Sequence, residues 1–383
     1  MKQTYFFITI LLLLSFQGCK KSVKVTPIHP ATTYTLTVNG GIGSGTYHAG
    51  DTVYVFSNPP TNTQVFNTWT GDATYMSTSN EWRSTLIMPS ANINIAANYK
   101  TISPVTFTHT TIYGSQVYYN IPSSYRGILL AFHGTGGAAV NWTQEQAENI
   151  NFCNYAVSNG YAMVITESKN RTTKQWDLSV NNNVDIINIQ VILDSLTING
   201  ILAPNKPLYG VGMSDGSAFC SLIAYEKGYN AEALYCLGGI NNVFPLTKVP
   251  TIWNMAVNDV TMDPNRQTAA LANYNKLLSR GIPCQYYVNP ATPLYASRFT
   301  IIPAISAGGS TNIYNAFKSA GYINAKGFFN VDPMVNTAWP AAIPSPYNPV
   351  AEEPISDQLY VAYAQHKFYK DSNYRTISFF NKF

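Results

Sequence analysis

Residues 212–216 read Gly-Met-Ser-Asp-Gly and place a serine where it could act as a nucleophile. The apolar run 207–211 precedes them and the helix-like run 217–225 follows, so the sequence predicts a strand, a sharp turn and a helix. On such a turn the serine is exposed at the end of a parallel strand, and the helix N-terminus offers N–H donors to a developing oxyanion. We predict that Ser214 is a catalytic nucleophile; the alternative is an ordinary N-cap serine.

A nucleophilic serine needs a base, and the sequence has five histidines. Three of them precede the region around Ser214, namely His29, His48 and His109. His133 ends an apolar run and begins a glycine-rich turn, where a structural residue is expected. His366, near the C-terminus, is therefore predicted as the general base; the alternative is that it is a solvated helix residue.

The third member of such a site is a carboxylate that orients the histidine. The run 249–257 predicts a strand, and Asp259 follows its end. Asp263 is a rival, although with proline after it Asp263 resembles a helix N-cap; Asp357 is a second rival because it is close to His366 in sequence. The chain order Ser, Asp, His is that of the α/β-hydrolases and differs from the order in two other serine hydrolase folds.

The composition limits the class of protein. At 383 residues the chain is longer than one typical domain, so two domains are expected. Charged residues make up only 11% of the sequence, and this low-charge, tyrosine-rich composition suits an exported protein. The net charge of +4, with no basic block longer than a lysine pair, gives no indication of nucleic-acid binding, and no Cys or His spacing resembles a metal site.

The N-terminus indicates export. An apolar run over 5–16 is followed by a Gly-Cys pair, which is typical of a signal peptide and too short to span a bilayer with ease. Because this pair resembles a bacterial lipoprotein signal, we predict a signal peptide over 1–18, lipidation of Cys19 and a tether over 19–31. The Phe-Gln pair at 16–17 departs from that motif, and ordinary cleavage with secretion is the alternative.

Lipidation of Cys19 would make the protein an outer-membrane lipoprotein that reaches the membrane through its anchor only, facing the periplasm or the exterior. The pair Lys20-Lys21 is not an acidic surface-export tag, which favours the periplasmic face. Export permits disulfides, but apolar surroundings make buried free thiols an equal alternative. The four remaining cysteines are Cys153, Cys220, Cys236 and Cys284.

Residues 32–101 alternate apolar and polar side chains between turn signals, which predicts a small all-β module. The segments 35–38, 49–53 and 66–72, closing on 97–100, resemble the internalin-type bacterial B-repeat. Members of that family are spacers and adhesive modules, so the resemblance implies no chemistry. The two tryptophans of this module, Trp69 and Trp82, are expected to pack in its core; ligand binding is the alternative.

Residues 102–383 alternate strand-like and helix-like runs, which predicts a mostly parallel sheet with helices on both faces. The strand-like runs are 116–119, 128–132, 162–165, 208–211, 233–237, 251–257 and 285–288. The helical runs are 145–159, 185–199, 214–227 and 265–280, with a last one over 372–380. Residues 290–357 break this rhythm and are expected to form a cap inserted before His366, with a helix over 310–321; a surface excursion unrelated to substrate is the alternative.

The runs 130–137, 164–168 and 210–216 resemble the α/β-hydrolase esterases, in particular those of the polyhydroxybutyrate depolymerase and feruloyl esterase type. The resemblance covers about residues 105–288 and resumes at 360–382. It implies that Ser214 attacks an ester carbonyl, that His366 transfers the proton and that Asp259 orients the imidazole. No metal or organic cofactor is implied.

The same resemblance places the oxyanion hole at the backbone N–H of Asp215 together with that of Thr135 or Gly136. Trp176 is expected either to line the substrate pocket or to pack in the core. The expected substrate is a small or polymer-linked carboxylic ester, and the sequence gives no oligomeric state. Two other functions remain open: a serine peptidase of related fold, for which the acidic residues Asp332, Glu352 and Glu353 make a poor case, and a non-catalytic surface adhesin.

Overall fold

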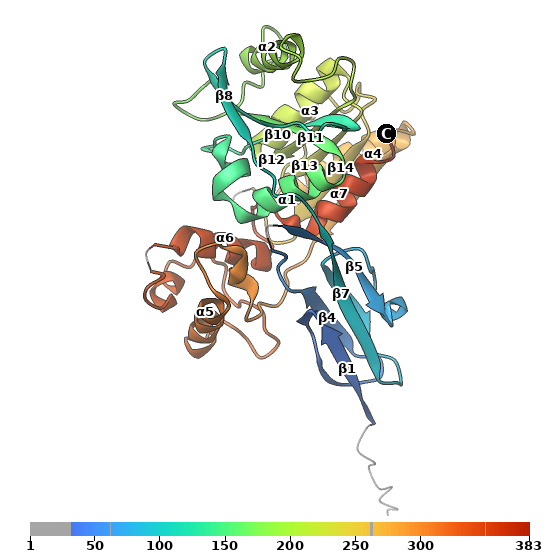
Figure 1. Ribbon diagram of the computed structural model, residues 1–383, viewed down its shortest axis with the longest axis vertical. Helices are drawn as coiled ribbons and strands as arrows, with labels where there is room; N and C mark the ends of the chain where they lie inside the picture. Colours follow the sequence, from blue (N-terminus) through green and yellow to red (C-terminus); the bar gives the residue numbers. More distant parts are fainter. Residues whose placement is uncertain (1–31, 62, 261–262, 349) are drawn as a thin grey trace, which may run out of the picture.

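The computed structural model describes residues 32–61, 63–260, 263–348 and 350–383. The predicted signal peptide, the lipidation site Cys19 and the tether lie outside the described residues. Within the described part, none of the helices has the length and apolar character needed to cross a membrane. Figure 1 shows an elongated β module joined to a larger domain in which helices surround a sheet, with a group of cap helices beside both.

The module consists of two small sheets whose alternating side chains meet in a shared core. One sheet has the strand order β3-β1-β7-β5 and the other β2-β4-β6. Their strands are β1 (Thr33–Asn39), β2 (Gly41–Ile42), β3 (Gly45–His48), β4 (Thr52–Ser57), β5 (Gln64–Gly71), β6 (Arg83–Ile87) and β7 (Ile93–Thr101), with a short helix η1 (Ala73–Tyr75). Leu36, Val55 and Leu86 are among the buried side chains, as the period-two pattern predicted.

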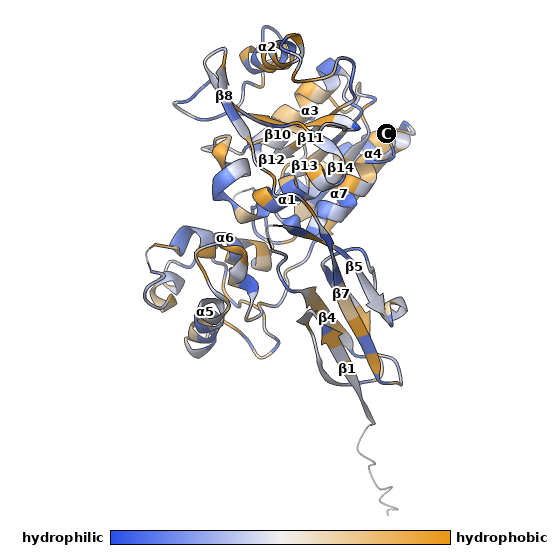
Figure 2. Cartoon of the chain, in the orientation of Figure 1, coloured by the Kyte–Doolittle hydropathy of each residue, from blue (hydrophilic) through white to orange (hydrophobic). Residues whose placement is uncertain are grey.

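The large domain is built on an eight-stranded sheet with the order β15-β14-β13-β12-β10-β11-β9-β8. Its strands are β8 (Thr108–Ile112), β9 (Ser115–Asn120), β10 (Gly127–Phe132), β11 (Tyr161–Thr166), β12 (Leu208–Met213), β13 (Ala231–Tyr235), β14 (Thr251–Ala256) and β15 (Cys284–Asn289). β8 and β9 run antiparallel to their neighbours and the other strands pair in parallel. The central strands are buried on both faces and largely apolar, as Figure 2 shows, and the domain has the α/β-hydrolase fold.

Helices cover both faces of this sheet and produce two cores. On one face lie α2 (Val184–Ile198), α3 (Asp215–Lys227) and α4 (Arg266–Ser279); on the other lie α1 (Ala147–Ser158) and α7 (Asn373–Phe380). A single turn of π-helix, η2 (Asn141–Glu145), precedes α1. The expectation that Asp263 caps the helix after β14 is wrong. The N-cap is Asn265, because the Asp263 carboxylate accepts the Asn265 N–H at 2.9 Å in a turn that ends before the helix begins.

The inserted cap forms a third hydrophobic core of its own, with Phe299, Ile313, Phe317, Ile355 and Leu359 among its buried residues. Its helices are η3 (Arg298–Ile301), α5 (Ala307–Ser319), η4 (Trp339–Ala342) and α6 (Glu352–Tyr363). α6 runs six residues past the expected end of the cap at 357, and its apolar face belongs to the cap core. The chain therefore leaves the cap only three residues before His366.

Candidate active site

Ser214 lies on a strained turn between β12 and α3. Its φ of 57° and ψ of −122° are a conformation that non-glycine residues rarely adopt. The turn is tight because a Cβ atom on Gly212 would lie 2.1 Å from the carbonyl oxygen of Gly216, and one on Gly216 would lie 2.3 Å from that of Phe132. The Ser214 N–H donates to the Tyr235 carbonyl at 2.9 Å, which fixes the turn to the neighbouring strand. The serine thus stands at the carboxyl end of the parallel sheet, as the pattern predicted.

The structure brings the three sequence-predicted residues Ser214, His366 and Asp259 into one hydrogen-bonded line. His366 Nε2 lies 2.8 Å from Ser214 Oγ, and His366 Nδ1 lies 2.7 Å from Asp259 Oδ2. Asp259 has no exposed surface, whereas the His366 side chain is 15% exposed. An ionised carboxylate beside Nδ1 keeps the proton on that nitrogen, so Nε2 is free to accept one from the serine.

Neither rival carboxylate reaches His366. Asp263 accepts the N–H of Asn265 and contributes to the turn before α4. Asp357, on α6, forms an ion pair with Lys367 at 2.5 Å, so its charge is directed to the residue next to the histidine.

Arg266 completes the site, and the sequence analysis does not assign it a role. Its guanidinium donates to Asp259 Oδ1 at 3.0 Å, the oxygen that His366 does not use, and the same nitrogen lies 2.6 Å from His366 Nδ1. The arginine is the first residue of α4, seven positions after the acid. A cation on the second carboxylate oxygen holds the carboxylate plane in place.

The two predicted oxyanion donors differ in the structure. Asp215 is the first residue of α3, so its N–H has no acceptor within the helix. On the turn after β10, the Gly136 N–H donates to the Lys174 carbonyl at 3.2 Å. Among the hydrogen bonds of the described residues, none uses the Thr135 N–H.

His133 stabilises that turn through hydrogen bonds of its buried ring. It is 2% exposed, its Nδ1 lies 2.8 Å from the Gly134 carbonyl oxygen, and its Nε2 accepts the Ser168 N–H at 3.2 Å. Because Nε2 accepts, the proton of the neutral ring is on Nδ1 and is donated to Gly134. Burial lowers the pKa of His133 to about 4, so the ring is neutral near pH 7. This agrees with the structural role expected for it.

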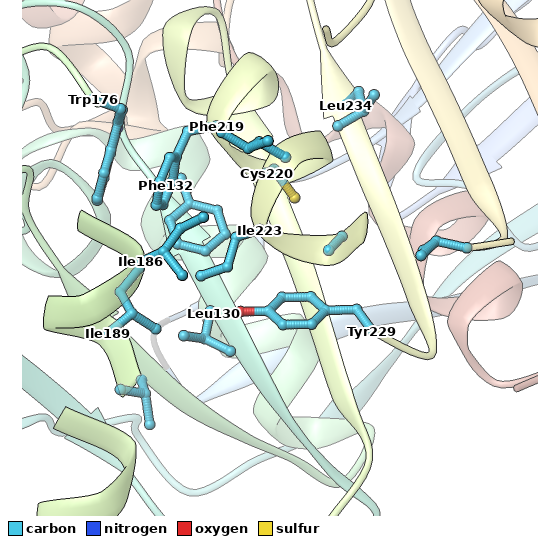
Figure 3. Packing of buried hydrophobic residues seen from close by; sticks show 14 of the residues in the cluster. Leu130, Phe132, Trp176, Ile186, Ile189, Phe219, Cys220, Ile223, Tyr229 and Leu234 are labelled. Carbon is cyan, nitrogen blue, oxygen red and sulfur yellow. The ribbon is translucent and has the colours of Figure 1, made fainter. Parts of the chain in front are cut away.

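Trp176 is a core residue in the structure, so the alternative that it lines the substrate pocket is wrong. Its side chain is 4% exposed and stacks on Phe219, with 4.5 Å between ring centroids. Figure 3 shows Trp176 among the packed hydrophobic residues of this core. Its indole N–H donates to the His133 carbonyl at 2.8 Å, and its backbone N–H donates to Asp215 Oδ2 at 2.9 Å. Trp176 therefore connects the turn after β10 to the first residue of α3, and burial raises the pKa of the Asp215 carboxyl.

The cysteines Cys153, Cys220, Cys236 and Cys284 are free thiols, which decides the open alternative against disulfides. Cys236 lies beside the site, and within the described ranges its sulfur, Asp259 and His366 offer donor atoms within 4.8 Å of one another. The set does not suit a metal ion: burial raises the pKa of the Cys236 thiol well above its usual value, and the Arg266 cation already occupies the carboxylate.

Residues 31–103 match the family described as divergent InlB B-repeat domain, and no curated protein matches the sequence. Similar solved structures include the Pyrococcus furiosus esterase Pf2001, which is 10% identical with a TM-score of 0.37 over 52% of this chain and 87% of that one. Est1E from Butyrivibrio proteoclasticus with ferulic acid bound is 13% identical, with a TM-score of 0.36 over 48% of this chain and 89% of that one.

A third similar structure, a predicted CIB-like hydrolase from Thermoplasma acidophilum, is 13% identical with a TM-score of 0.35 over 48% of this chain and 86% of that one. The chain thus joins a module similar to the divergent InlB B-repeat family to a domain with the α/β-hydrolase fold.

Proposed function

We propose that this protein is an exported serine hydrolase that cleaves carboxylic esters through an acyl-enzyme intermediate. The observation that carries the proposal is the continuous line of hydrogen bonds from Ser214 Oγ through His366 to Asp259 Oδ2. A buried carboxylate, an imidazole and a serine on a strained strand-to-helix turn are the parts that nucleophilic ester cleavage needs.

In the first half-reaction, Ser214 Oγ attacks the ester carbonyl carbon while His366 Nε2 takes the hydroxyl proton. Asp259 stabilises the resulting imidazolium and does not itself become protonated. The C–O bond to the alcohol then breaks, and His366 returns the proton to the departing oxygen. This leaves the acyl group on Ser214.

In the second half-reaction, water attacks the acyl carbon and His366 again accepts a proton. The acid leaves and Ser214 Oγ recovers its hydrogen. In both halves the negative charge on the carbonyl oxygen is stabilised by the N–H of Asp215 and that of Thr135. Each such donor is worth about 10²–10³ in kcat.

Arg266 has two opposing effects in this scheme. It orients Asp259, which favours the productive position of His366. Its positive charge, 2.6 Å from Nδ1, also disfavours the imidazolium that forms during attack. The Asp259 carboxylate contacts both cations, Arg266 through Oδ1 and His366 through Oδ2, and its negative charge offsets their repulsion.

A peptidase that reads an N-terminal amine needs acidic side chains facing the site. Of the acidic candidates, Asp332 accepts a hydrogen bond from Gln365 at 2.7 Å, and Glu352 and Glu353 lie in the first turn of α6. We therefore place the ester ahead of the peptide, and catalysis ahead of adhesion.

The decisive experiment is the hydrolysis of p-nitrophenyl esters, acetate through octanoate, by the protein lacking residues 1–19. We expect Ser214→Ala and His366→Ala each to reduce kcat by more than about 10³. Ser103→Ala and His48→Ala, which alter exposed residues away from the site, are the matched controls and should retain activity. Folded protein that cleaves no ester and does not react with a fluorophosphonate would overturn the proposal and favour the adhesin.

We also propose export and anchoring through Cys19, on the evidence of the N-terminal residue pattern alone. Expression of the full chain in a bacterial host with labelled palmitate tests this. Label in the membrane fraction that is lost in Cys19→Ser is expected; an unlabelled, secreted product would favour ordinary cleavage.

A further inference from the structure

The base lies on a loop that is held by three different parts of the molecule. We define the His366 loop as residues 364–372, between α6 and α7. On the cap side, Gln365 Nε2 donates to Asp332 Oδ2 at 2.7 Å. In the middle, the Tyr369 hydroxyl donates to the Met255 carbonyl at 2.8 Å, on the strand that precedes the acid. The third part that holds the loop is the B-repeat-like module.

The module contacts the end of the His366 loop through two consecutive residues at the start of β6. The Arg83 guanidinium pairs with Asp371 at 3.1 Å, and the two side chains are only 10% and 8% exposed. The Lys370 ammonium lies over the ring of Trp82, 4.2 Å from its centroid. Lys370 and Asp371 follow His366 by four and five positions, so little chain separates these contacts from the catalytic imidazole.

A second ion pair fixes the helix that follows the loop. Both carboxylate oxygens of Glu81 accept hydrogen bonds from Arg375, at 2.6 and 2.9 Å. Arg375 is in the first turn of α7. Such a two-point pair defines an orientation as well as a distance, so the direction in which the chain leaves the loop is set by the module.

Two further parts of the enzyme meet at the same place. The backbone N–H of Lys370 donates to Glu148 of α1 at 2.6 Å, and Glu148 also pairs with Arg298 of the cap at 3.5 Å. The cap residue Tyr295 stacks on Phe56 of the module with 4.6 Å between ring centroids. The module, the cap and the sheet domain therefore share one buried junction, and the His366 loop ends in it.

This junction differs from the connection expected of a spacer. A spacer needs only a covalent link, and domains joined in that way move relative to one another unless their interface is large and buried. Here charged side chains are largely removed from water and held in ion pairs, Arg83 with Asp371 and Glu148 with Arg298. Such pairs define a single arrangement, because a displaced partner would leave a buried charge uncompensated.

We propose that the B-repeat-like module positions the catalytic base, with Glu81, Trp82 and Arg83 acting as positioning residues on the His366 loop. The proposal rests on the proposed function, because it takes His366 as the base. The module is then a part of the enzyme in addition to any part it plays between membrane and enzyme.

The test uses Arg83→Gln in the protein lacking residues 1–19, well below its melting temperature. We expect kcat to fall roughly tenfold with KM within about twofold, since a small displacement of a catalytic group affects chemistry more than binding. The low-field proton resonance of the His366 Nδ1–H, assigned by its loss in His366→Ala, should broaden or shift. Arg83→Lys keeps the positive charge opposite Asp371, so both kcat and the Nδ1–H resonance should be close to those of the wild type.

Lys100→Ala is the matched control. It removes a different contact between the module and the sheet domain, the 2.6 Å hydrogen bond from Lys100 Nζ to the Ser158 carbonyl, which does not involve the His366 loop. It should change neither kcat nor the resonance. An equal effect of Lys100→Ala and Arg83→Gln would overturn the proposal, because the module would then act only through general stability.

Two variants keep the test sharp if Arg83→Gln does not fold. Trp82→Phe removes the indole beneath Lys370 and retains an aromatic ring, and Glu81→Gln keeps the shape of the side chain that binds Arg375. Unchanged kcat and an unchanged resonance in both would overturn the proposal. A wild-type protein that cleaves no ester refutes the proposed function instead, and the resonance then still decides whether the module holds the imidazole.

Discussion

The proposed nucleophile and the proposed base are positioned in opposite ways. Ser214 is held by its immediate neighbours: Gly212 and Gly216 make the turn possible, and the adjacent strand accepts its N–H. His366 is held by residues far away in the chain. Its partner Asp259 is 107 positions distant, and the ion pair that fixes the helix after its loop joins Glu81 to Arg375, 294 positions later.

This difference predicts which substitutions disrupt the Ser214 turn and which disrupt the His366 loop. A locally determined turn forms whenever its strand and helix form, so substitutions affect it through backbone space and conformation. A loop assembled from the cap, the sheet and the module depends on three surfaces meeting correctly. Its failure should change catalysis before it changes the fold.

The largest expected effect is on kcat and tests the positioning of His366 by residues distant in the sequence. In Asp259→Asn the amide can donate to His366 Nδ1 and favour the wrong tautomer, so kcat should fall by about 10⁴. Arg266 would also lose its ionic partner. The measurement is kcat for a p-nitrophenyl ester, with Asp263→Asn as the control of unchanged activity. A loss of less than tenfold in Asp259→Asn would mean that the base is oriented by something else.

The second prediction tests the local side. A methyl group at 212 meets only backbone atoms, with the Gly216 oxygen at 2.1 Å and the Ser217 nitrogen at 2.5 Å, so no side chain can move aside. We expect Gly212→Ala to lower the free energy of unfolding by about 3 kcal/mol or more and to abolish fluorophosphonate labelling of Ser214.

Gly308→Ala is the control for that substitution. Gly308 lies within α5, and nothing is found within 4 Å of its added Cβ, so it should gain about 0.5–1 kcal/mol from the greater helix propensity of alanine. Urea titration measures both variants. A Gly212→Ala protein as stable as wild type would show that the turn has freedom that its backbone contacts do not suggest.

The third prediction concerns pH and the turn after β10. The pKa of His133 is about 4 in the folded protein and about 6.5 when exposed. Between these values the unfolded chain binds a proton that the folded protein does not, so stability is complete above pH 6.5 and is lost as the pH falls towards 4. The loss from this residue should be about 3 kcal/mol.

Urea titrations from pH 7 to pH 4.5 measure that loss, and a His133→Gln variant should show a flatter profile than wild type. Parallel profiles for the two proteins would mean that His133 is protonated in the fold or is not buried in solution.

The sequence predicted the strand and the helix on either side of Ser214 well, because the residues that determine them are contiguous. The strand expected over 208–211 is Leu208–Met213, and the helix expected over 214–227 is Asp215–Lys227. Asp259 could be predicted to lie near His366 because an acid after a strand end needs only the strand to be recognised. Each of these inferences depends on fewer than about twenty neighbouring residues.

The roles of Arg266 and Trp176 could not be predicted from the sequence, because they depend on contacts with residues that only the fold brings close. Arg266 was expected in a helix, but nothing in its neighbours says that its first turn faces the acid. Trp176 is apolar enough for a pocket or a core, and its contact with Phe219 decided for the core. The helix α6 was not predicted. Its Pro354 fits the first turn, where the missing N–H of proline has no partner to lose.

The smallest expected effect is that of Gly136→Ala on stability, which distinguishes a glycine required by its positive φ from one required by close contacts. Gly136 has a φ of +79°, yet nothing is found within 4 Å of an added Cβ, so Gly136→Ala suffers only from backbone conformation. A loss of about 1–2 kcal/mol in the free energy of unfolding is expected, with kcat reduced only as far as the Thr135 N–H moves. Urea titration and ester hydrolysis together measure this. If Gly136→Ala were as destabilised as Gly212→Ala, the turn after β10 would be packed as tightly as the turn that carries Ser214. Steric contacts, and not only the positive φ, would then explain the glycine at 136.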